Sequence, residues 1–291
     1  MIAFLYFQPP TPLDVDPSLL LLIRGYFYGI DFSEKSDHLK YNINMADIDS
    51  PFFDIPVPQS VKRLLKVPPV CLSKLEDLHI LDLIKDFGQE FDCSPGEIIH
   101  ALNLASGPSD VMIVLARPST LHDYTVTAEK FIRDCITLRA VDELIKISTK
   151  GSRSIYNVSV VDAFMFKPKN RLLIPDQRCH QLLAQIIRLK RPKVLLLCHT
   201  ESYSDPWMHK FELLPCNNGY RMSREVIPIG ETEIHAVQSF HPAVAVYHKR
   251  LNPEYKALLL HHFVAAFSLL HGPYNEPSVV ETIRSICAKN R

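Results

Sequence analysis

From residue 110 onwards, short apolar runs alternate with amphipathic segments of helical period, and this alternation limits the possible folds more than any other feature. Val111–Ala116 reads V-M-I-V-L-A, a continuous apolar run typical of a strand buried on both faces. Further strands are predicted at 154–163, 193–198 and 233–239, and helices at 126–147, 175–190 and 251–270. This order indicates a three-layer α/β/α domain around a central parallel four-stranded sheet.

The carboxyl ends of the predicted strands mark the place where a ligand is expected. In parallel α/β sheets, ligands bind in the crevice outside these strand ends. The candidate site therefore comprises the segments that follow each strand, at 115–119, 162–169, 199–202 and 240–249.

The first 106 residues form a separate part of the predicted organisation. Prolines and aromatic side chains are dense in residues 1–70, which predicts an irregular wrap, because prolines interrupt long helices. Residues 72–106 predict a helical pair, and Ser94 with Glu97 fits a capping box at the start of the second helix. This pair either closes one side of the core or forms a helix-turn-helix reader. The absence of Arg and Lys from the second helix favours the first interpretation.

We divide the chain into a wrap with a helical pair at 1–106, an α/β domain at 107–275 and a C-terminal tail at 276–291. The charge is balanced, with 32 Lys+Arg against 32 Asp+Glu, which argues against binding nucleic acid through bulk charge. The nine glycines form no phosphate-binding loop, and no C-x-x-C joins any of the seven cysteines. We expect a soluble intracellular protein, nuclear or cytoplasmic, with no membrane segment.

Several short motifs occur in a fixed order at the strand ends. They cover about residues 108–272, and none is specific by itself. The ordered set resembles the uracil-DNA glycosylase superfamily, most closely the branch often found with an iron–sulfur cluster. The matching positions are Pro118, Asn157-Val158, Lys167-Pro168, Asn170-Arg171, Cys179, Pro192-Lys193-Val194, Phe240-His241-Pro242-Ala243, Asn252-Pro253 and Lys256.

The resemblance implies an enzyme that flips a deaminated base out of DNA and cleaves its N-glycosidic bond. His241 would donate to the uracil O2 as negative charge develops there, and Asn157 would read the edge of the base. Pro118 and Phe240 belong to the same base-binding motifs. Val244 to Tyr247 match the loop that carries an apolar wedge. The residues expected to contact the DNA backbone are Arg117, Lys167, Arg171, Lys249 and Arg250.

One departure from the family pattern bears directly on activity. The family carries an acid or amide beside the proline of its first motif, whereas this chain has Arg117 before Pro118. General-base help is worth about 10²–10⁴-fold in rate. Asp162 or Asp123 could supply the missing carboxylate, in which case the chain is a glycosylase of base-excision repair. The alternative is a catalytically inactive glycosylase-fold scaffold that binds DNA or a protein. A protein partner could also bind through residues 1–106.

No cofactor and no metal are predicted. An iron–sulfur cluster requires four cysteine ligands at defined spacing, and Ala163 and Phe164 stand where the family has a Lys-Cys pair. Cys179 is therefore interpreted as a buried helix residue. His235, His241 and His248 straddle a strand and a loop, without the motifs of a zinc site.

Overall fold

The computed structural model describes residues 75–107, 110–199, 224–229, 231–239, 241–243 and 253–272. All of them belong to one compact unit, Ile43–Arg291. The predicted wrap at 1–70 and the predicted tail at 276–291 lie outside the described residues. Within the described part of the chain, no helix is long and apolar enough to cross a membrane.

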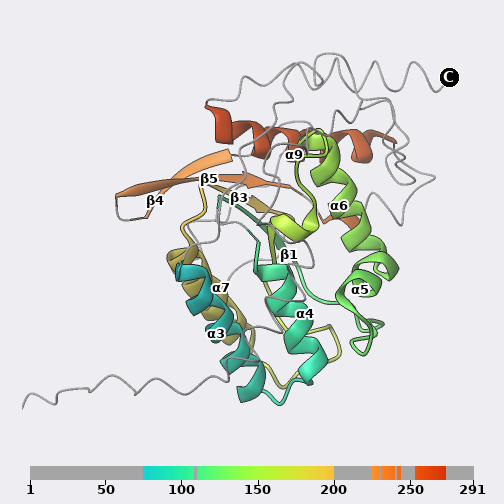
Figure 1. Cartoon of the computed structure of the whole chain (residues 1–291). Helices are drawn as coiled ribbons and strands as arrows, with labels where there is room; N and C mark the ends of the chain where they lie inside the picture. Colours follow the sequence, from blue (N-terminus) through green and yellow to red (C-terminus); the bar gives the residue numbers. More distant parts are fainter. Residues whose placement is uncertain are drawn as a thin grey trace, which may run out of the picture. The chain divides into compact units, whose positions relative to one another are not determined.

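A five-stranded sheet forms the centre of the fold (Figure 1). Its strands lie in the order β2-β1-β3-β5-β4. All neighbours pair in parallel except β4, which runs antiparallel to β5. The strands are β1 (Val111–Leu115), β2 (Ser159–Asp162), β3 (Val194–Leu197), β4 (Arg224–Ile229) and β5 (Thr232–Gln238). The predicted α/β fold with a largely parallel sheet is confirmed, but the prediction of four strands is wrong.

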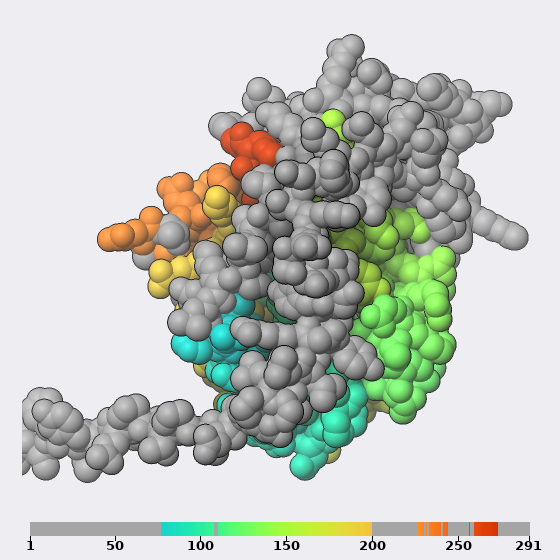
Figure 2. Space-filling model, in the orientation of Figure 1, coloured from blue at the N-terminus to red at the C-terminus, as the bar shows by residue number. Residues whose placement is uncertain are grey.

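The strand that was not predicted, β4, is the edge of the sheet and forms a hairpin with β5. Val226 is half-exposed and Ile227 is buried, which is the alternation of a strand with one covered face. Pro228 lacks a backbone N–H and is therefore tolerated at an edge. The hairpin reaches the molecular surface, where its orange atoms stand out in Figure 2.

Helices account for most of the remaining described chain. They are α3 (Leu75–Glu90), α4 (Pro95–Ala105), α5 (Ala128–Asp134), α6 (Ile136–Ser148), α7 (Asp176–Lys190) and α9 (Pro253–Ser268), with short 3-10 helices η2 (Ile155–Asn157) and η4 (Leu269–His271). The helix predicted at 126–147 is two helices, because Cys135 has an extended backbone that ends α5 before α6 begins. The strand predicted at 154–163 begins only at Ser159, after η2.

Two apolar cores lie on opposite faces of the sheet. Val111 and Ile113 of β1 pack in the core that includes α6 and α9, while Met112 and Val114 face the core that includes α3 and α7. Figure 1 shows these helix groups on either side of the strands. The interpretation of residues 72–106 as a helical pair that closes one side of the core is confirmed for α3 and α4, since Ile80, Ile84 and Ala105 are part of the second core.

Candidate ligand cavity at the carboxyl ends of the strands

A cavity of ≈ 650 Å³ opens at the carboxyl ends of β1 and β2. In the order β2-β1-β3, the chain passes from β1 to β2 on one side of β1 and then crosses to β3 on its other side. Ligands of α/β sheets bind where the direction of the connections reverses in this way. Four of the predicted site residues line this cavity together: Arg117, Pro118, Asp162 and His241. Its other polar lining residues include Glu97, His100, Ser119, Thr120, His122, Tyr124, Asp134, Thr137 and Lys169.

Asp162 is the last residue of β2 and pairs in register with Leu115, the last residue of β1. Burial raises the pKa of this carboxyl to about 7, although the positive charge of Arg117 acts in the opposite direction. A carboxyl with such a pKa exchanges a proton near neutral pH, as a general base must. Of the two carboxylates considered from the sequence, Asp162 lines the cavity. Asp123 is exposed and accepts hydrogen bonds from Thr125.

Arg117 follows β1 and lies in the wall beside Asp162. Its guanidinium carbon is 4.1 Å from the centre of the Phe164 ring, a cation–π contact. This stacking fixes the planar group against the wall, and its charge acts on the Asp162 carboxyl. Arg117 therefore shares the cavity with a carboxylate that partly offsets its charge.

His241 follows β5 and lines the same cavity. The backbone N–H of Ala243 donates to His241 Nδ1 over 3.3 Å. Because Nδ1 accepts this bond, the neutral ring carries its proton on Nε2 and can act as a donor through that atom. Ser239, the first residue after β5, is held against α9, because its Oγ lies 2.9 Å from His262 Nδ1. Burial lowers the pKa of His262 to about 3, so its ring stays neutral.

Aromatic rings form one wall of the cavity. The His100 and Phe131 rings stack with centroids 4.2 Å apart, and Tyr124 stacks on Phe131 at 5.6 Å. The His122 ring packs edge-on against Phe131, with the two ring centroids 4.9 Å apart. Burial lowers the pKa values of both histidines, so the wall is uncharged. Such a surface suits a flat aromatic ligand. No sequence motif pointed to these residues, because they come from α4, α5 and the loop between β1 and α5 rather than from one strand end.

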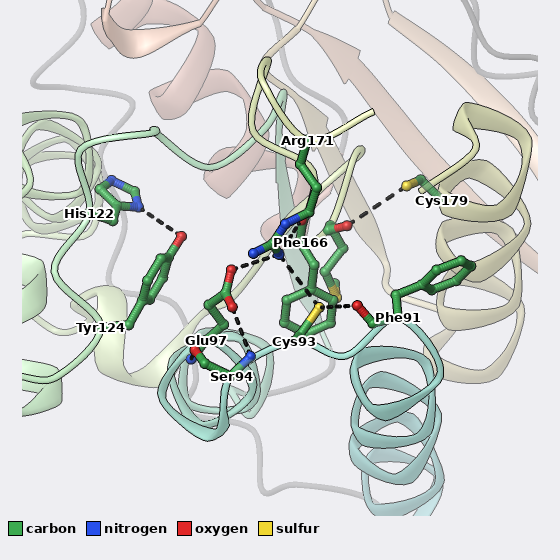
Figure 3. A network of polar contacts seen from close by, with 10 residues as sticks. Phe91, Cys93, Ser94, Glu97, His122, Tyr124, Phe166, Arg171 and Cys179 are labelled. Carbon is green, nitrogen blue, oxygen red and sulfur yellow. Dashed lines mark hydrogen bonds and ion pairs between the residues drawn. The ribbon is translucent and has the colours of Figure 1, made fainter. Parts of the chain in front are cut away.

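Glu97 connects this wall to the loop after β2 (Figure 3). Its carboxylate is paired with Arg171 over 2.7 Å and accepts the Ser94 backbone N–H over 2.8 Å. Burial by itself raises the pKa of Glu97, but these hydrogen bonds and the Arg171 charge bring it below its usual value. The side chain is therefore a buried carboxylate held by its partners. The predicted capping box is confirmed, because Ser94 Oγ also accepts the Glu97 backbone N–H.

Of the other predicted residues, those that the structure describes do not line this cavity. Asn157 ends η2 before β2 begins, and its amide oxygen accepts the Ser154 backbone N–H over 2.7 Å. Lys167 is nearly buried and pairs with Asp176 over 2.5 Å. Arg171 lines an adjoining hollow instead. The roles predicted for Phe240, Val244, Tyr247, Lys249 and Arg250 concern positions outside the described residues.

The described cysteines are structural in character. Cys179 is buried in α7, as predicted, and burial raises its pKa to about 12. Burial likewise raises the pKa of Cys93 to about 11. Thiols with such pKa values stay protonated and are poor nucleophiles. Among the residues described here, no group of three His, Cys, Asp or Glu side chains is arranged to hold a metal ion.

Fold and cavity together define the chain as an α/β protein with a partly aromatic ligand cavity at the carboxyl ends of its parallel strands. Comparison of the sequence with family models and with curated proteins finds no match. The side chains that the fold brings together in this cavity are therefore the basis on which a function can be inferred.

Proposed function

We propose that the chain is a uracil-DNA glycosylase-like enzyme that cleaves the N-glycosidic bond of a deaminated base extruded from DNA. The observation that carries this proposal is that Asp162 and His241, from two different strand ends, line one cavity with an aromatic wall. A volume of ≈ 650 Å³ lies within the range of small-ligand sites and accommodates a nucleobase with its sugar.

In this proposal the base lies against the wall formed by Tyr124 and Phe131. His241 donates from Nε2 to the base O2, where the negative charge develops as the bond breaks. Asp162 accepts a proton from a water molecule whose oxygen forms the new bond to the sugar C1′. The electron pair of the C1′–N bond leaves with the base. These roles require Asp162 to be ionised and His241 to carry its Nε2 proton.

Arg117 is the group that most opposes this chemistry, since a positive charge disfavours a developing oxocarbenium ion. Two observations support the enzyme over an inactive scaffold. The Arg117 guanidinium stacks on the ring of the buried Phe164, and the Asp162 carboxyl in the same cavity is close enough for the Arg117 charge to act on its pKa. An Arg117 side chain that filled the cavity without a nearby carboxylate would have supported the scaffold instead.

The test is strand cleavage at uracil. Purified full-length protein is incubated with a labelled single-stranded oligonucleotide that carries one uracil, and alkali then breaks abasic sites. Removal of the oxyanion donor in His241→Ala is expected to lower the rate by about 10²–10³-fold. His79→Ala, at an exposed position of α3, is the matched control and should cleave like the wild type.

Three outcomes separate the alternatives. Cleavage that disappears in His241→Ala and persists in His79→Ala supports the glycosylase. Failure of the wild type to cleave at high protein concentration, with DNA still retained in a gel shift, contradicts the enzyme and leaves a DNA-binding scaffold. Failure both to cleave and to bind DNA would move the function to a protein partner of residues 1–106.

A further inference from the structure

One polar atom in the wall of the cavity has no hydrogen-bond partner. His100, on α4, lines the cavity and is only 4% exposed, and its Nδ1 is unpaired among the residues that the structure describes. A buried polar atom without a partner costs free energy, and in folded proteins nearly all such atoms are paired with protein or ordered water. His100 Nδ1 is thus available to a ligand that occupies the cavity.

Packing holds the His100 ring in place. The ring stacks on Phe131, with the two centroids 4.2 Å apart and the two planes inclined by 14°. One turn earlier on the same face of α4, a Cβ on Gly96 would lie 2.3 Å from the Tyr124 carbonyl oxygen, so the backbone of the loop before α5 rests directly on the helix. With Phe131 over its face and the loop against α4, the ring has little freedom to turn toward another partner.

The surroundings of His100 also determine which ring nitrogen carries the proton. Burial lowers the pKa of His100 and keeps the ring neutral, although hydrogen bonds to the backbone at Val126 and Tyr124 act in the opposite direction. A backbone group that raises the pKa of a histidine is a carbonyl that accepts from a ring N–H. Since Nδ1 has no partner, these carbonyls accept from Nε2. The neutral ring is therefore protonated at Nε2, and its Nδ1 presents a lone pair that accepts a hydrogen bond.

The cavity thus offers one acceptor and one donor to the edge of a ligand. His100 Nδ1 is the acceptor, and His241 Nε2 is the donor, since His241 Nδ1 accepts the Ala243 backbone N–H. A planar ring on the aromatic wall pairs with both when its edge carries a carbonyl oxygen and a ring N–H, which makes it a cyclic amide. The motif likeness would assign the reading of this edge to Asn157, but its amide oxygen is bonded to the Ser154 backbone N–H.

We infer that His100 determines the specificity of this cavity by accepting a hydrogen bond at Nδ1 from a ring N–H of the ligand. The inference rests on the proposed function for the identification of the ligand as a nucleobase. Uracil carries a hydrogen on N3, whereas N3 of cytosine carries a lone pair in the same place. That lone pair would face the lone pair of His100 Nδ1 and leave both atoms unpaired, which disfavours the amino-bearing base. His100 thus distinguishes a deaminated base from its parent without a contribution from Asn157.

The experiment measures the binding of free nucleosides and needs neither DNA nor turnover. Ligand-observed NMR gives the Kd of the full-length protein for 2′-deoxyuridine, 3-methyl-2′-deoxyuridine and 2′-deoxycytidine. The wild type should bind 2′-deoxyuridine about ten- to a hundredfold more tightly than the other two, which is the effect of one unmade buried hydrogen bond. His100→Phe keeps a ring against Phe131 but removes the acceptor, and it should bind all three within about threefold of one another. His79→Phe, at an exposed position of α3, is the matched control and should keep the wild-type preference.

A second measurement uses the wild type alone, so it does not depend on the folding of a variant. The nitrogen chemical shifts of the His100 ring report which of its two nitrogens is protonated. They should place the proton on Nε2, and the Nδ1 signal should shift when 2′-deoxyuridine binds. A proton on Nδ1 would overturn the inference, because that atom could not then accept a hydrogen bond.

The outcomes for His100 and for the glycosylase are separable. A preference for 2′-deoxyuridine that is lost in His100→Phe, without excision of uracil from DNA, would support the inference and contradict the enzyme. Excision of uracil together with an unchanged preference in His100→Phe would overturn the inference and leave the enzyme standing. A wild type that binds none of the three nucleosides, or that binds all three equally, would also overturn it.

Discussion

Asp162 combines a strand-end position with a pKa that burial raises to about 7, and this makes its protonation the most informative property of the site. Below that pH the carboxyl is neutral and cannot accept a proton from water. Above it, the carboxylate is available next to the Arg117 charge. As pH rises through neutrality, the rate of the proposed chemistry should therefore increase, whereas the stability of the fold should decrease.

The first prediction concerns Asp162→Asn. The raised pKa means that ionisation opposes folding: the stability that the protonated carboxyl provides is complete below the unfolded value near ~3.9 and is lost as pH rises through about 7. We expect the variant to be more stable than the wild type at pH 8, by between about 1 and 4 kcal/mol, and equally stable at pH 4. Uracil excision should fall by about 10²–10⁴-fold.

Urea unfolding at the two pH values measures the first effect, and the strand-cleavage assay measures the second. A variant whose stability difference from the wild type is the same at pH 4 and pH 8 would show that Asp162 has an ordinary pKa. Full excision by the variant would remove it from the proposed mechanism.

The second prediction concerns Arg117→Met. The Arg117 charge lowers the pKa of Asp162 against the effect of burial, so its removal should raise that pKa further. We expect the acid limb of the pH–rate profile to move to higher pH, so that excision at pH 7 falls relative to its alkaline plateau. In alkaline buffer, where Asp162 is ionised in both proteins, the variant should match or exceed the wild type, because the charge that opposes the oxocarbenium ion is gone. Arg188→Met, on the exposed side of α7, is the control and should keep the wild-type profile. A loss that is uniform across pH would instead indicate that Arg117 acts by contacting DNA.

At the scale of elements, α4 links local sequence to the cavity. Its first turn is closed by the reciprocal Ser94 and Glu97 hydrogen bonds, and the same Glu97 holds Arg171 at the cavity rim. One short motif thus determines both where the helix begins and how the loop after β2 is attached.

The third prediction concerns this cap. Ser94→Ala removes the oxygen that accepts the Glu97 backbone N–H over 3.2 Å, and we expect a loss of about 1 kcal/mol in the free energy of unfolding. Ser94→Thr keeps the hydroxyl and should lose only a few tenths of a kcal/mol by comparison. Urea denaturation of the three proteins checks the order. Equal losses in both variants would contradict the capping role.

The elements that the sequence predicted best are those with a strong local signal. Continuous apolar runs predicted β1 and β3, and the capping box predicted the start of α4, because each depends on residues close together in the chain. The β4 strand escaped prediction because its six residues alternate weakly and contain Pro228. Its pairing depends on β5 rather than on its own sequence.

The site was less predictable than the fold, for a physical reason. Asp162 and His241 line one cavity because the first ends β2 and the second follows β5, and parallel strands end on the same side of a sheet. The aromatic wall depends on long-range packing of the loop before α5 against α4, which no local pattern encodes. The motif likeness at Asn157 gave a sequence position but not the direction of a side chain, which here bonds to Ser154.

At the scale of the whole described unit, the two ends of the parallel strands differ in chemistry. The carboxyl ends border an open cavity lined by titratable groups, whereas buried ion pairs lie at the amino ends. Lys190, at the end of α7, pairs with Asp77 of α3 over 3.0 Å and donates to the Gly107 carbonyl over 3.1 Å. Arg153 and Asp110 precede β2 and β1 and form a two-pronged pair over 2.6 and 2.7 Å.

The final prediction tests whether the amino ends of the strands contribute to stability without affecting the cavity. It concerns the Arg153–Asp110 pair, whose side chains are only 1% and 4% exposed. Arg153→Met leaves a buried carboxylate without its principal partner, and Asp110→Ala leaves a buried guanidinium, so each should cost about 3–5 kcal/mol of folding free energy. Removing both charges in the double variant should cost clearly less than the sum of the single losses, because neither charge remains uncompensated. Urea unfolding of all four proteins gives the coupling free energy between the two charges, and additive losses would contradict it.

Because the pair lies at the amino ends of the strands, opposite the cavity, DNA binding by the folded double variant should match that of the wild type. Weakened DNA binding would show instead that the buried pair at the amino ends of the strands influences the geometry of the cavity.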